Sequence, residues 1–232
     1  MHTKVLLLDM DGVVIRNPLY TKSIQNRVHS FVKKKLDKFM PDKKVEQINK
    51  IMYKEFGHTV IGMQKLYDPT ISLKEFSDYV YHKDFLNSLH IINEDEVAIK
   101  RLLKTARENN TDVYIFSNAP DAWCNKVLES MNITDMPIIG CDHYIFQSTE
   151  STSLCLKPNF ITYLKVMQYI NLKNTKTKNT YIMIDDQLQN VLPMIENPSW
   201  KGVWFNNDKT DYQIYSPKLY TVNEFDQLHS FI

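Results

Sequence analysis

Short apolar runs rich in valine and isoleucine alternate with helix-like patterns along most of this 232-residue chain. The runs occupy residues 5–8, 113–116, 137–140, 181–184, 203–205 and 220–222. Between them, apolar residues recur every three or four positions, as at Ile99, Leu102 and Leu103. Strands that alternate with helices are typical of a parallel sheet with helices on its faces. The sequence therefore predicts an α/β protein with a doubly wound, mainly parallel sheet.

Residues 16–90 interrupt this alternation, because they contain no strand-like run. Apolar residues keep helical spacing over residues 20–39, 45–56 and 73–81. A connection between a strand and the next helix is usually only a few residues long. We therefore expect a helical cap domain at residues 16–90, inserted into a core made of residues 1–15 and 91–232.

The composition is ordinary for a globular protein, with 43% hydrophobic and 24% charged residues. A net charge of +1 gives no sign of a nucleic-acid-binding surface. No apolar stretch approaches the roughly 18 residues of a membrane span, and the first apolar run ends in two acids, unlike a signal peptide. Cys124, Cys141 and Cys155 show no paired spacing, which is typical of a reducing compartment. We expect a cytoplasmic protein with no membrane partner.

The first predicted strand ends in two carboxylates, Asp9 and Asp11, followed by Gly12 in the segment LLLDMDGVV. Side chains two positions apart on an extended segment point the same way, so both can address one ligand. Ligands of open α/β sheets bind at the carboxyl ends of the strands. A plain turn, with Asp side chains bonded to the local backbone, is the structural alternative.

Three later fragments also place polar groups at strand ends or helix starts. YIFSNAP brings Ser117 and Asn118 to a strand-to-helix junction, where hydroxyl and backbone N–H groups can bind an anion. Lys157 directly precedes a proline and a predicted helix. YIMIDDQLQN ends in Asp185 and Asp186, which are costly to bury without a cation. Each fragment alone is also common turn or surface chemistry, so the order of all four is what points to one site.

This order, Asp9-x-Asp11, Ser117, Lys157 and Asp185-Asp186, resembles the haloacid dehalogenase (HAD) superfamily of phosphohydrolases over nearly the whole chain. Residues 16–90 resemble the cap insertion of that superfamily. The segments YKEFGHTVIGMQKL, EFSDYVYHKDF and SNAPDAWCNKVL are similar to stretches of its pyrimidine 5'-nucleotidase-like branch. This chain departs from that branch at Ser117, where a Thr is usual, at Trp123, where a His is expected, and at the Tyr81-His82 pair, where the branch has Val-His.

The resemblance implies a Mg²⁺-dependent phosphatase that works through an aspartyl-phosphate. Asp9 would be the nucleophile and a metal ligand. Asp11 would protonate the leaving group and then activate water, while its backbone carbonyl binds the metal; the surrounding charges would raise its pKa for this role. Haloacid dehalogenases lack an acid at the position of Asp11, so this residue favours phosphate chemistry. Val13, where capless protein phosphatases have Thr, weighs against that group.

The remaining roles follow from the same resemblance. Ser117 and the N–H groups of Asn118 and Ala119 would hold phosphoryl oxygens, and Lys157 would neutralise charge on the phosphate and on Asp9. The third protein ligand of Mg²⁺ would be Asp186, with Asp185 orienting a metal-bound water and Asn190 supporting them. Which of the two acids binds the metal directly stays open.

The expected partner is a small phosphorylated metabolite, a nucleoside 5'-monophosphate by the resemblance. Tyr53, His58 and Gln64 are candidate specificity residues, although packing or surface roles are commoner for side chains such as His58 and His82. The alternatives are a sugar-phosphate phosphatase or a phosphomutase on the same fold, or a binding module without catalysis.

Charge is distributed unevenly along the chain. Residues 16–90 hold 14 Lys and Arg against 8 Asp and Glu, whereas the other residues hold 14 against 19. For the runs at residues 33–35 and 43–44 we favour a solvated helix face. The alternative is a basic wall that attracts a phosphorylated substrate.

Overall fold

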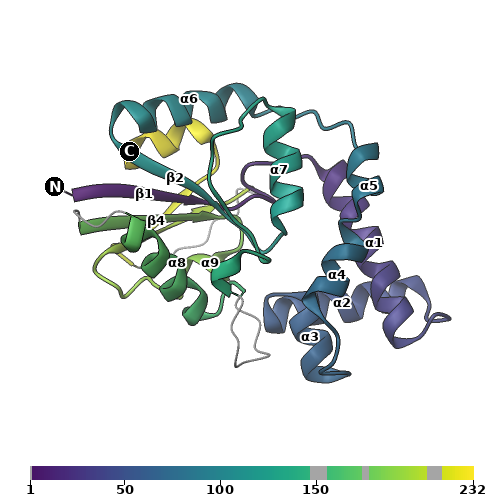
Figure 1. Ribbon diagram of the computed structural model, residues 1–232. Helices are drawn as coiled ribbons and strands as arrows, with labels where there is room; N and C mark the ends of the chain where they lie inside the picture. The colour runs from purple at the N-terminus through teal and green to yellow at the C-terminus, as the bar shows by residue number, and fades with distance from the viewer. Residues whose placement is uncertain (1, 147–155, 174–177, 208–215) are drawn as a thin grey trace.

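A parallel sheet forms the centre of the molecule, shown as a computed structural model in Figure 1. The structure describes residues 2–146, 156–173, 178–207 and 216–232, so Cys155 lies outside the described residues. The strands are β1 (His2–Leu8), β2 (Thr111–Phe116), β3 (Ile138–Ile139), β4 (Lys178–Asp185), β5 (Trp200–Phe205) and β6 (Leu219–Val222). They pair in the order β3-β2-β1-β4-β5-β6, and every neighbouring pair is parallel. The predicted doubly wound sheet is confirmed, and the order reverses at β1, which places a binding crevice at its carboxyl end.

The two faces of the sheet are covered by different helices, because side chains alternate along each strand. Leu6 and Leu8 of β1 point to one face, where they belong to the same buried cluster as residues of α6 (Glu96–Glu108), α7 (Asp121–Ser130) and the 3-10 helix η2 (Phe225–Phe231). Val5 and Leu7 point to the other face, toward α8 (Phe160–Lys173) and α9 (Leu188–Val191). Figure 1 shows α6 and α8 on opposite sides of the strands. A 3-10 turn, η1 (Tyr144–Phe146), lies between β3 and α8 in the chain.

Between β1 and α6 the chain forms only helices, which we call the helical insertion. They are α1 (Pro18–Leu36), α2 (Asp42–Phe56), α3 (Thr59–Leu66), α4 (Leu73–Val80) and α5 (Lys83–Ser88). Asn17 starts α1 by accepting a hydrogen bond from the N–H of Leu19. Gly57 ends α2 with a left-handed φ of 74°, which splits α2 from α3. The predicted helical runs overlap α1, α2 and α4, but the sequence did not predict the separate helices α3 and α5.

The chain enters and leaves the helical insertion at neighbouring points. Arg16, just before α1, forms a two-bond ion pair with Asp95, just before α6. The side-chain amide of Asn93 donates to the backbone oxygen of Val14 at 2.7 Å. Figure 1 shows the insertion beyond the carboxyl ends of the strands. It is therefore connected to the core by two chain segments that are bonded to each other. Within the described ranges, no helix combines the length and apolar character that a bilayer crossing requires.

Candidate active site

The loop after β1 carries the first two predicted acids against the end of β4. The N–H of Asp9 donates to the backbone oxygen of Ile184 at 2.9 Å, which continues the sheet by one residue. Gly12 adopts a φ of 81°, and a Cβ atom added there would lie 2.4 Å from Cγ of Asp186. Glycine is therefore required at this position for two reasons: its backbone conformation and the close approach of two acidic segments.

Lys157 is fully buried and binds both acidic strand ends. Its ammonium Nζ lies 3.0 Å from Oδ1 of Asp9 and 2.6 Å from Oδ2 of Asp185, and it donates to the backbone oxygen of Phe116 at 2.9 Å. The structure thus brings together residues that are far apart in the sequence. A buried ammonium between two carboxylates satisfies its three N–H donors and partly offsets the carboxylates' repulsion.

Asn118 and Ser117, which follow β2, lie at the same crevice, but their side chains bond within the protein. The amide of Asn118 accepts from the N–H of Lys157 at 2.8 Å and donates to its carbonyl at 2.9 Å. Ser117 is buried, and its Oγ accepts from the N–H of Ala119 at 3.2 Å. The side chain of Asn118 therefore fixes the segment that carries Lys157, a role that the sequence pattern did not reveal.

Asp9, Asp185 and Asp186 each offer one oxygen that lies within 4.8 Å of the others, a grouping that can hold a cation. Desolvation, followed by the charges of Asp185 and Asp9, raises the pKa of Asp186 to about 8. Desolvation, followed by the charge of Asp9, raises the pKa of Asp185 to about 6. Carboxylates crowded in this way resist ionisation until a positive charge joins them.

Asp185 and Asp186 differ in how many hydrogen bonds their carboxylates already accept from other groups of the protein. Both oxygens of Asp185 accept from the amide of Asn190, at 3.0 and 3.1 Å, and one also accepts from the N–H of Gln187. The carboxylate of Asp186 accepts from the side-chain amide of Gln187 at 2.8 Å and lines the pocket described below. Asp186 is thus the acid with the greater free capacity to bind a ligand.

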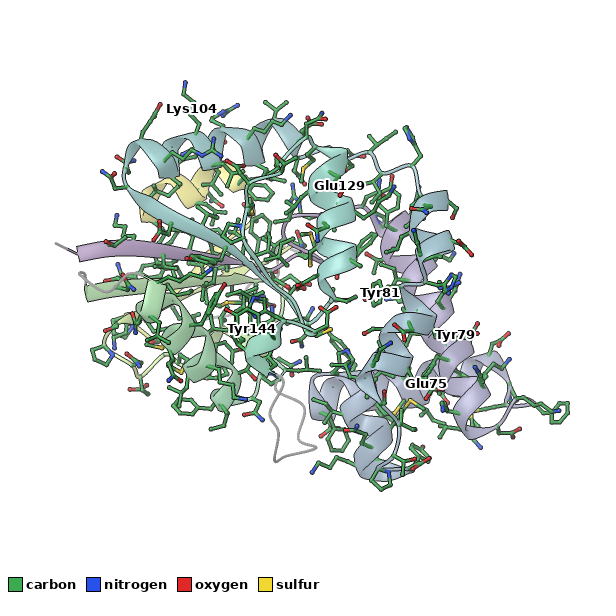
Figure 2. All side chains as sticks on the ribbon, in the orientation of Figure 1. Glu75, Tyr79, Tyr81, Lys104, Glu129 and Tyr144 are labelled. Carbon is green, nitrogen blue, oxygen red and sulfur yellow. The ribbon has the colours of Figure 1, made fainter. Side chains whose placement is uncertain are left out.

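Asp11 lies beside an indole. Nε1 of Trp123, on α7, donates to Oδ1 of Asp11 at 2.9 Å, and Trp123 is fully buried. Desolvation, followed by the charge of Asp9, raises the pKa of Asp11 to about 7, while the bond from Trp123 opposes the rise. The Tyr81 ring lies 6.3 Å from the Trp123 ring, and Figure 2 shows Tyr81 where α4 meets α7. Unlike a histidine, the indole donates a hydrogen bond but cannot exchange a proton with Asp11.

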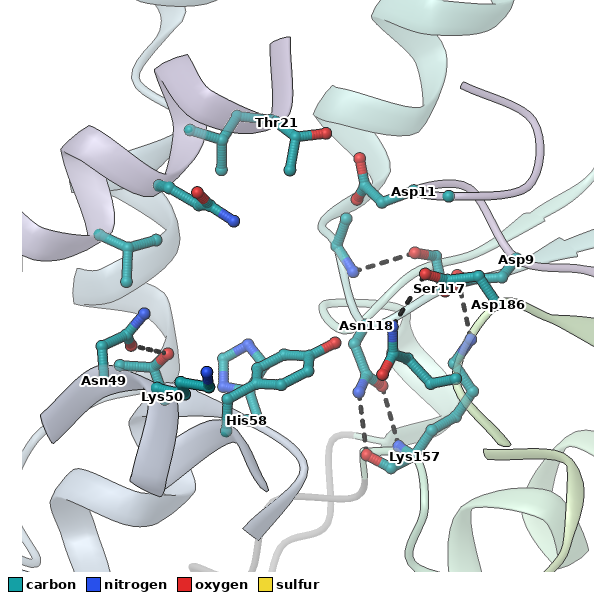
Figure 3. A pocket seen from close by; sticks show the side chains of 18 of the residues that line it. Asp9, Asp11, Thr21, Asn49, Lys50, His58, Ser117, Asn118, Lys157 and Asp186 are labelled. Carbon is teal, nitrogen blue, oxygen red and sulfur yellow. Dashed lines mark hydrogen bonds and ion pairs between the residues drawn. The ribbon is translucent and has the colours of Figure 1, made fainter. Parts of the chain in front are cut away.

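A pocket of about 660 Å³ separates this edge of the sheet from the helical insertion (Figure 3). Its core side is lined by Asp9, Asp11, Ser117, Asn118, Lys157 and Asp186, whereas Asp185 does not line it. Of the candidate specificity residues, Tyr53 and His58 line the pocket. Gln64 does not; its amide donates to the backbone oxygen of Ile71 at 2.6 Å. His82 does not either, since it caps the start of α5 with an exposed ring.

The basic residues of the insertion divide between solvent and pocket. Lys50 and Lys54, on α2, line the pocket. The runs at residues 33–35 and 43–44 do not, and two of their members pair with acids of the insertion, Lys33 with Asp42 and Lys35 with Glu75. Those two runs therefore lie on helix faces outside the pocket, as favoured from the sequence. The lysines that line the pocket are Lys50 and Lys54.

His58 makes the stability of the protein pH-dependent. Nδ1 of this buried residue accepts from the N–H of Val60 at 3.1 Å, and burial lowers the pKa of His58 to about 4. Between pH 4 and 6.5 the unfolded chain then holds this proton more often than the folded protein does. As the pH falls through this window, we expect His58 to lower the free energy of unfolding by roughly 3 kcal/mol at most.

The measurement is urea unfolding of the wild type and of His58→Asn across this window. Asparagine keeps an acceptor for the N–H of Val60, so the variant should lose less stability than the wild type on acidification. His82→Asn is the matched control, because His82 accepts from the N–H of Asp84 in the same capping position but is exposed. Parallel pH profiles for wild type and His58→Asn would contradict the assignment.

No family model and no curated protein matches the sequence. Solved structures do match along nearly the whole chain. A HAD phosphatase from Thermococcus onnurineus is 15% identical, with 99% of this chain and 97% of that chain covered at a TM-score of 0.58. CbbY from Rhodobacter sphaeroides, in complex with phosphate, is 11% identical, with 98% and 96% covered at 0.62. The HAD-hydrolase YfnB from Bacillus subtilis, bound to magnesium, is 12% identical, with 100% and 99% covered at 0.55. The chain therefore has the HAD-like α/β fold, as its sequence motifs implied.

Proposed function

We propose that this protein is a Mg²⁺-dependent phosphomonoester hydrolase that works through an aspartyl-phosphate, with a nucleoside 5'-monophosphate as substrate. The observation that carries the proposal is the position of Asp9, which lines the pocket and is held by Lys157 within a group of carboxylates suited to a cation. The HAD-like fold supports it, since the three similar structures include a phosphatase, a phosphate complex and a magnesium complex.

Asp9 is the nucleophile in this proposal. Its Oδ1 accepts from the N–H of Met10 at 2.8 Å and contacts Lys157, and among the described residues no donor bonds to Oδ2. The Oδ2 lone pair would form the new bond to phosphorus as the bond between phosphorus and the ester oxygen breaks. The hydroxyl of Ser117 would donate a hydrogen bond to the phosphoryl group, and the ammonium of Lys157 would offset its negative charge.

Asp11 is the acid and base. With a pKa raised to about 7, it can hold a proton at neutral pH and give it to the departing alkoxide. The resulting carboxylate can then accept a proton from the water that attacks the aspartyl-phosphate, which frees Asp9 and releases phosphate. The bond from Trp123 fixes the direction of the Asp11 carboxyl group during both transfers.

The acidic cluster fits Mg²⁺, which prefers oxygen ligands. Asp9, Asp186 and the backbone carbonyl of Asp11 would hold the ion, while Asp185 keeps its bonds to Lys157 and Asn190. When bound, Mg²⁺ would offset charge that builds on the phosphoryl oxygens. The raised pKa of Asp186 is a property of the acids alone that a bound cation would reverse.

Asp186→Asn should weaken Mg²⁺ binding by at least about tenfold, since it removes one charged ligand from the group. Calorimetric titration with Mg²⁺ measures this directly, and thermal unfolding should show a smaller rise in Tm with Mg²⁺ than in the wild type. Glu196→Gln is the control, because it removes an exposed carboxylate of the same segment. Equal Mg²⁺ affinity in wild type and Asp186→Asn would exclude Asp186 as a ligand.

The substrate is tested with a panel of phosphate esters in the presence of Mg²⁺. A preference for nucleoside 5'-monophosphates supports the proposal, whereas a clear preference for sugar phosphates would replace it with a sugar-phosphate phosphatase. We further propose that residues 16–90 act as a cap domain over the core and that the protein works in the cytoplasm, which suits its free, buried thiols Cys124 and Cys141.

A further inference from the structure

The wall of the pocket that faces the core carboxylates is rich in hydrogen-bond donors. Figure 3 shows Asn49, Lys50 and His58, all from the helical insertion, across the pocket from Asp9 and Asp186. The orientations of Asn49 and His58 follow from their other contacts. We call Asn49, Lys50 and His58 the donor wall.

Asn49 presents its N–H groups to the pocket. The hydroxyl of Thr59, which is buried, donates to Oδ1 of Asn49 at 2.7 Å. In this arrangement Oδ1 faces Thr59, and Nδ2 is the end of the amide that remains for the pocket. The remaining end of the side chain is therefore a pair of donors.

His58 is also a donor. Its Nδ1 accepts from the N–H of Val60, so Nδ1 carries no proton, and the neutral ring carries its proton on Nε2. The preceding residue, Gly57, lies against the core: a Cβ atom on Gly57 would approach Cδ of Pro158 to 2.4 Å. The turn between α2 and α3 thus packs directly on the segment of Lys157, and His58 lies at the boundary between the insertion and the core.

Lys50 adds a positive charge. Among the described residues, no carboxylate lies within ion-pair distance of Lys50 or of Lys54, although Glu46 also lines the pocket one turn earlier on α2. A pocket wall with amide, imidazole and ammonium donors matches oxygens that accept several bonds and carry negative charge.

We propose that the donor wall binds a second anionic group of the substrate, a carboxylate or a second phosphate carried by the leaving alcohol. This inference rests on the proposed phosphatase function, and it narrows the proposed nucleoside 5'-monophosphates to those whose nucleoside carries such a second anionic group. The reacting phosphate lies against Asp9 and Lys157, and the second anion lies against Asn49, Lys50 and His58. Charge-assisted bonds from this wall should strengthen binding by about 10- to 100-fold over an otherwise similar monophosphate.

Binding to Asp9→Asn in the presence of Mg²⁺, measured by calorimetry, tests the inference without turnover. Adenosine 3',5'-bisphosphate is compared with adenosine 5'-monophosphate, and 3-phosphoglycerate with glycerol 3-phosphate. Tighter binding of adenosine 3',5'-bisphosphate than of adenosine 5'-monophosphate identifies the second anion as a phosphate. Tighter binding of 3-phosphoglycerate than of glycerol 3-phosphate identifies it as a carboxylate. Equal affinities within both pairs would overturn the inference.

Two substitutions then test whether the donor wall causes the preference for ligands with a second anionic group. Asn49→Asp keeps the oxygen that accepts from Thr59 and replaces the donor end with an anion, so it should abolish or invert the preference. Lys50→Met should reduce the preference to about twofold or less. Lys44→Met, on the same helix but outside the pocket lining, is the control that should keep it. A preference that survives both pocket substitutions would also overturn the inference.

The outcomes separate this inference from the proposed function. In one outcome, wild-type protein releases phosphate from monophosphates while Asp9→Asn binds both members of each pair equally. In that case the phosphatase proposal stands, and the proposed binding of a second anionic group by the donor wall is refuted. If the bisphosphate or phosphocarboxylate binds preferentially but no ester is hydrolysed, the donor wall is supported and the phosphatase proposal fails.

Discussion

Asp9→Asn is expected to lower the rate of phosphate release by at least about 10⁴-fold, because an amide cannot replace the carboxylate as nucleophile. The substitution preserves the shape of the side chain, and Lys157 keeps its contacts with Asp185 and Phe116. The folded structure should therefore survive while the chemistry is lost. Release of inorganic phosphate from the best substrate of the panel, at saturating substrate and Mg²⁺, is the measurement.

Asp135→Asn is the matched control, since it removes one exposed carboxylate that pairs with Arg107 on the surface. It should keep wild-type turnover, and both variants should give wild-type far-UV spectra. The aspartyl-phosphate itself should be trapped by acid quenching in the wild type and absent from Asp9→Asn. Turnover of Asp9→Asn within tenfold of the wild type would refute the proposed mechanism.

Lys157→Met should destabilise the fold by about 3–5 kcal/mol, because it leaves Asp9 and Asp185 buried without their shared counter-charge. It should also abolish activity, since Lys157 contacts the proposed nucleophile. Urea unfolding at neutral pH without Mg²⁺ measures the loss. An unchanged unfolding midpoint would show that the buried ammonium contributes little to stability.

A double-mutant cycle separates the ion pair from the loss of packing. In the Lys157→Met background, Asp185→Asn should cost much less stability than in the wild type, because its charge no longer has a partner there. Added Mg²⁺ should restore part of the stability of Lys157→Met, since it supplies another positive charge to the same acids. Strictly additive effects of the two substitutions would contradict a direct interaction.

The strands and the positions of the core site residues could be predicted from the sequence because each rests on a local pattern. A buried run such as residues 181–184 is short and apolar, and the acids that follow it stand at its carboxyl end. In a parallel sheet such ends meet at one edge, so Asp9, Ser117 and Asp186 could be expected at the same edge of the sheet. The comparisons with solved structures confirm the fold, whereas the roles of these residues stay predictions.

Contacts between distant segments could not be predicted, because they depend on how helices pack. No pattern indicates that Asn118 holds the backbone of Lys157 or that Trp123 bonds to Asp11. The charge of the helical insertion was visible in its composition, but whether Lys50 or Lys33 faces the pocket depends on the rotation of a helix about its axis. Helix α3 was not predicted, because its eight residues are too few to repeat a helical pattern of apolar positions.

The paired chain segments at Arg16–Asp95 and Val14–Asn93 have a consequence for how such a protein can change over time. Because the helical insertion departs from and returns to the same place, residues within it can be replaced, lengthened or shortened without altering the register of the sheet. The acids of the core and the donors of the insertion can then vary independently. Reaction type and substrate preference would thus be inherited as two separable traits, carried by two parts of one chain that are connected through a pair of bonded segments.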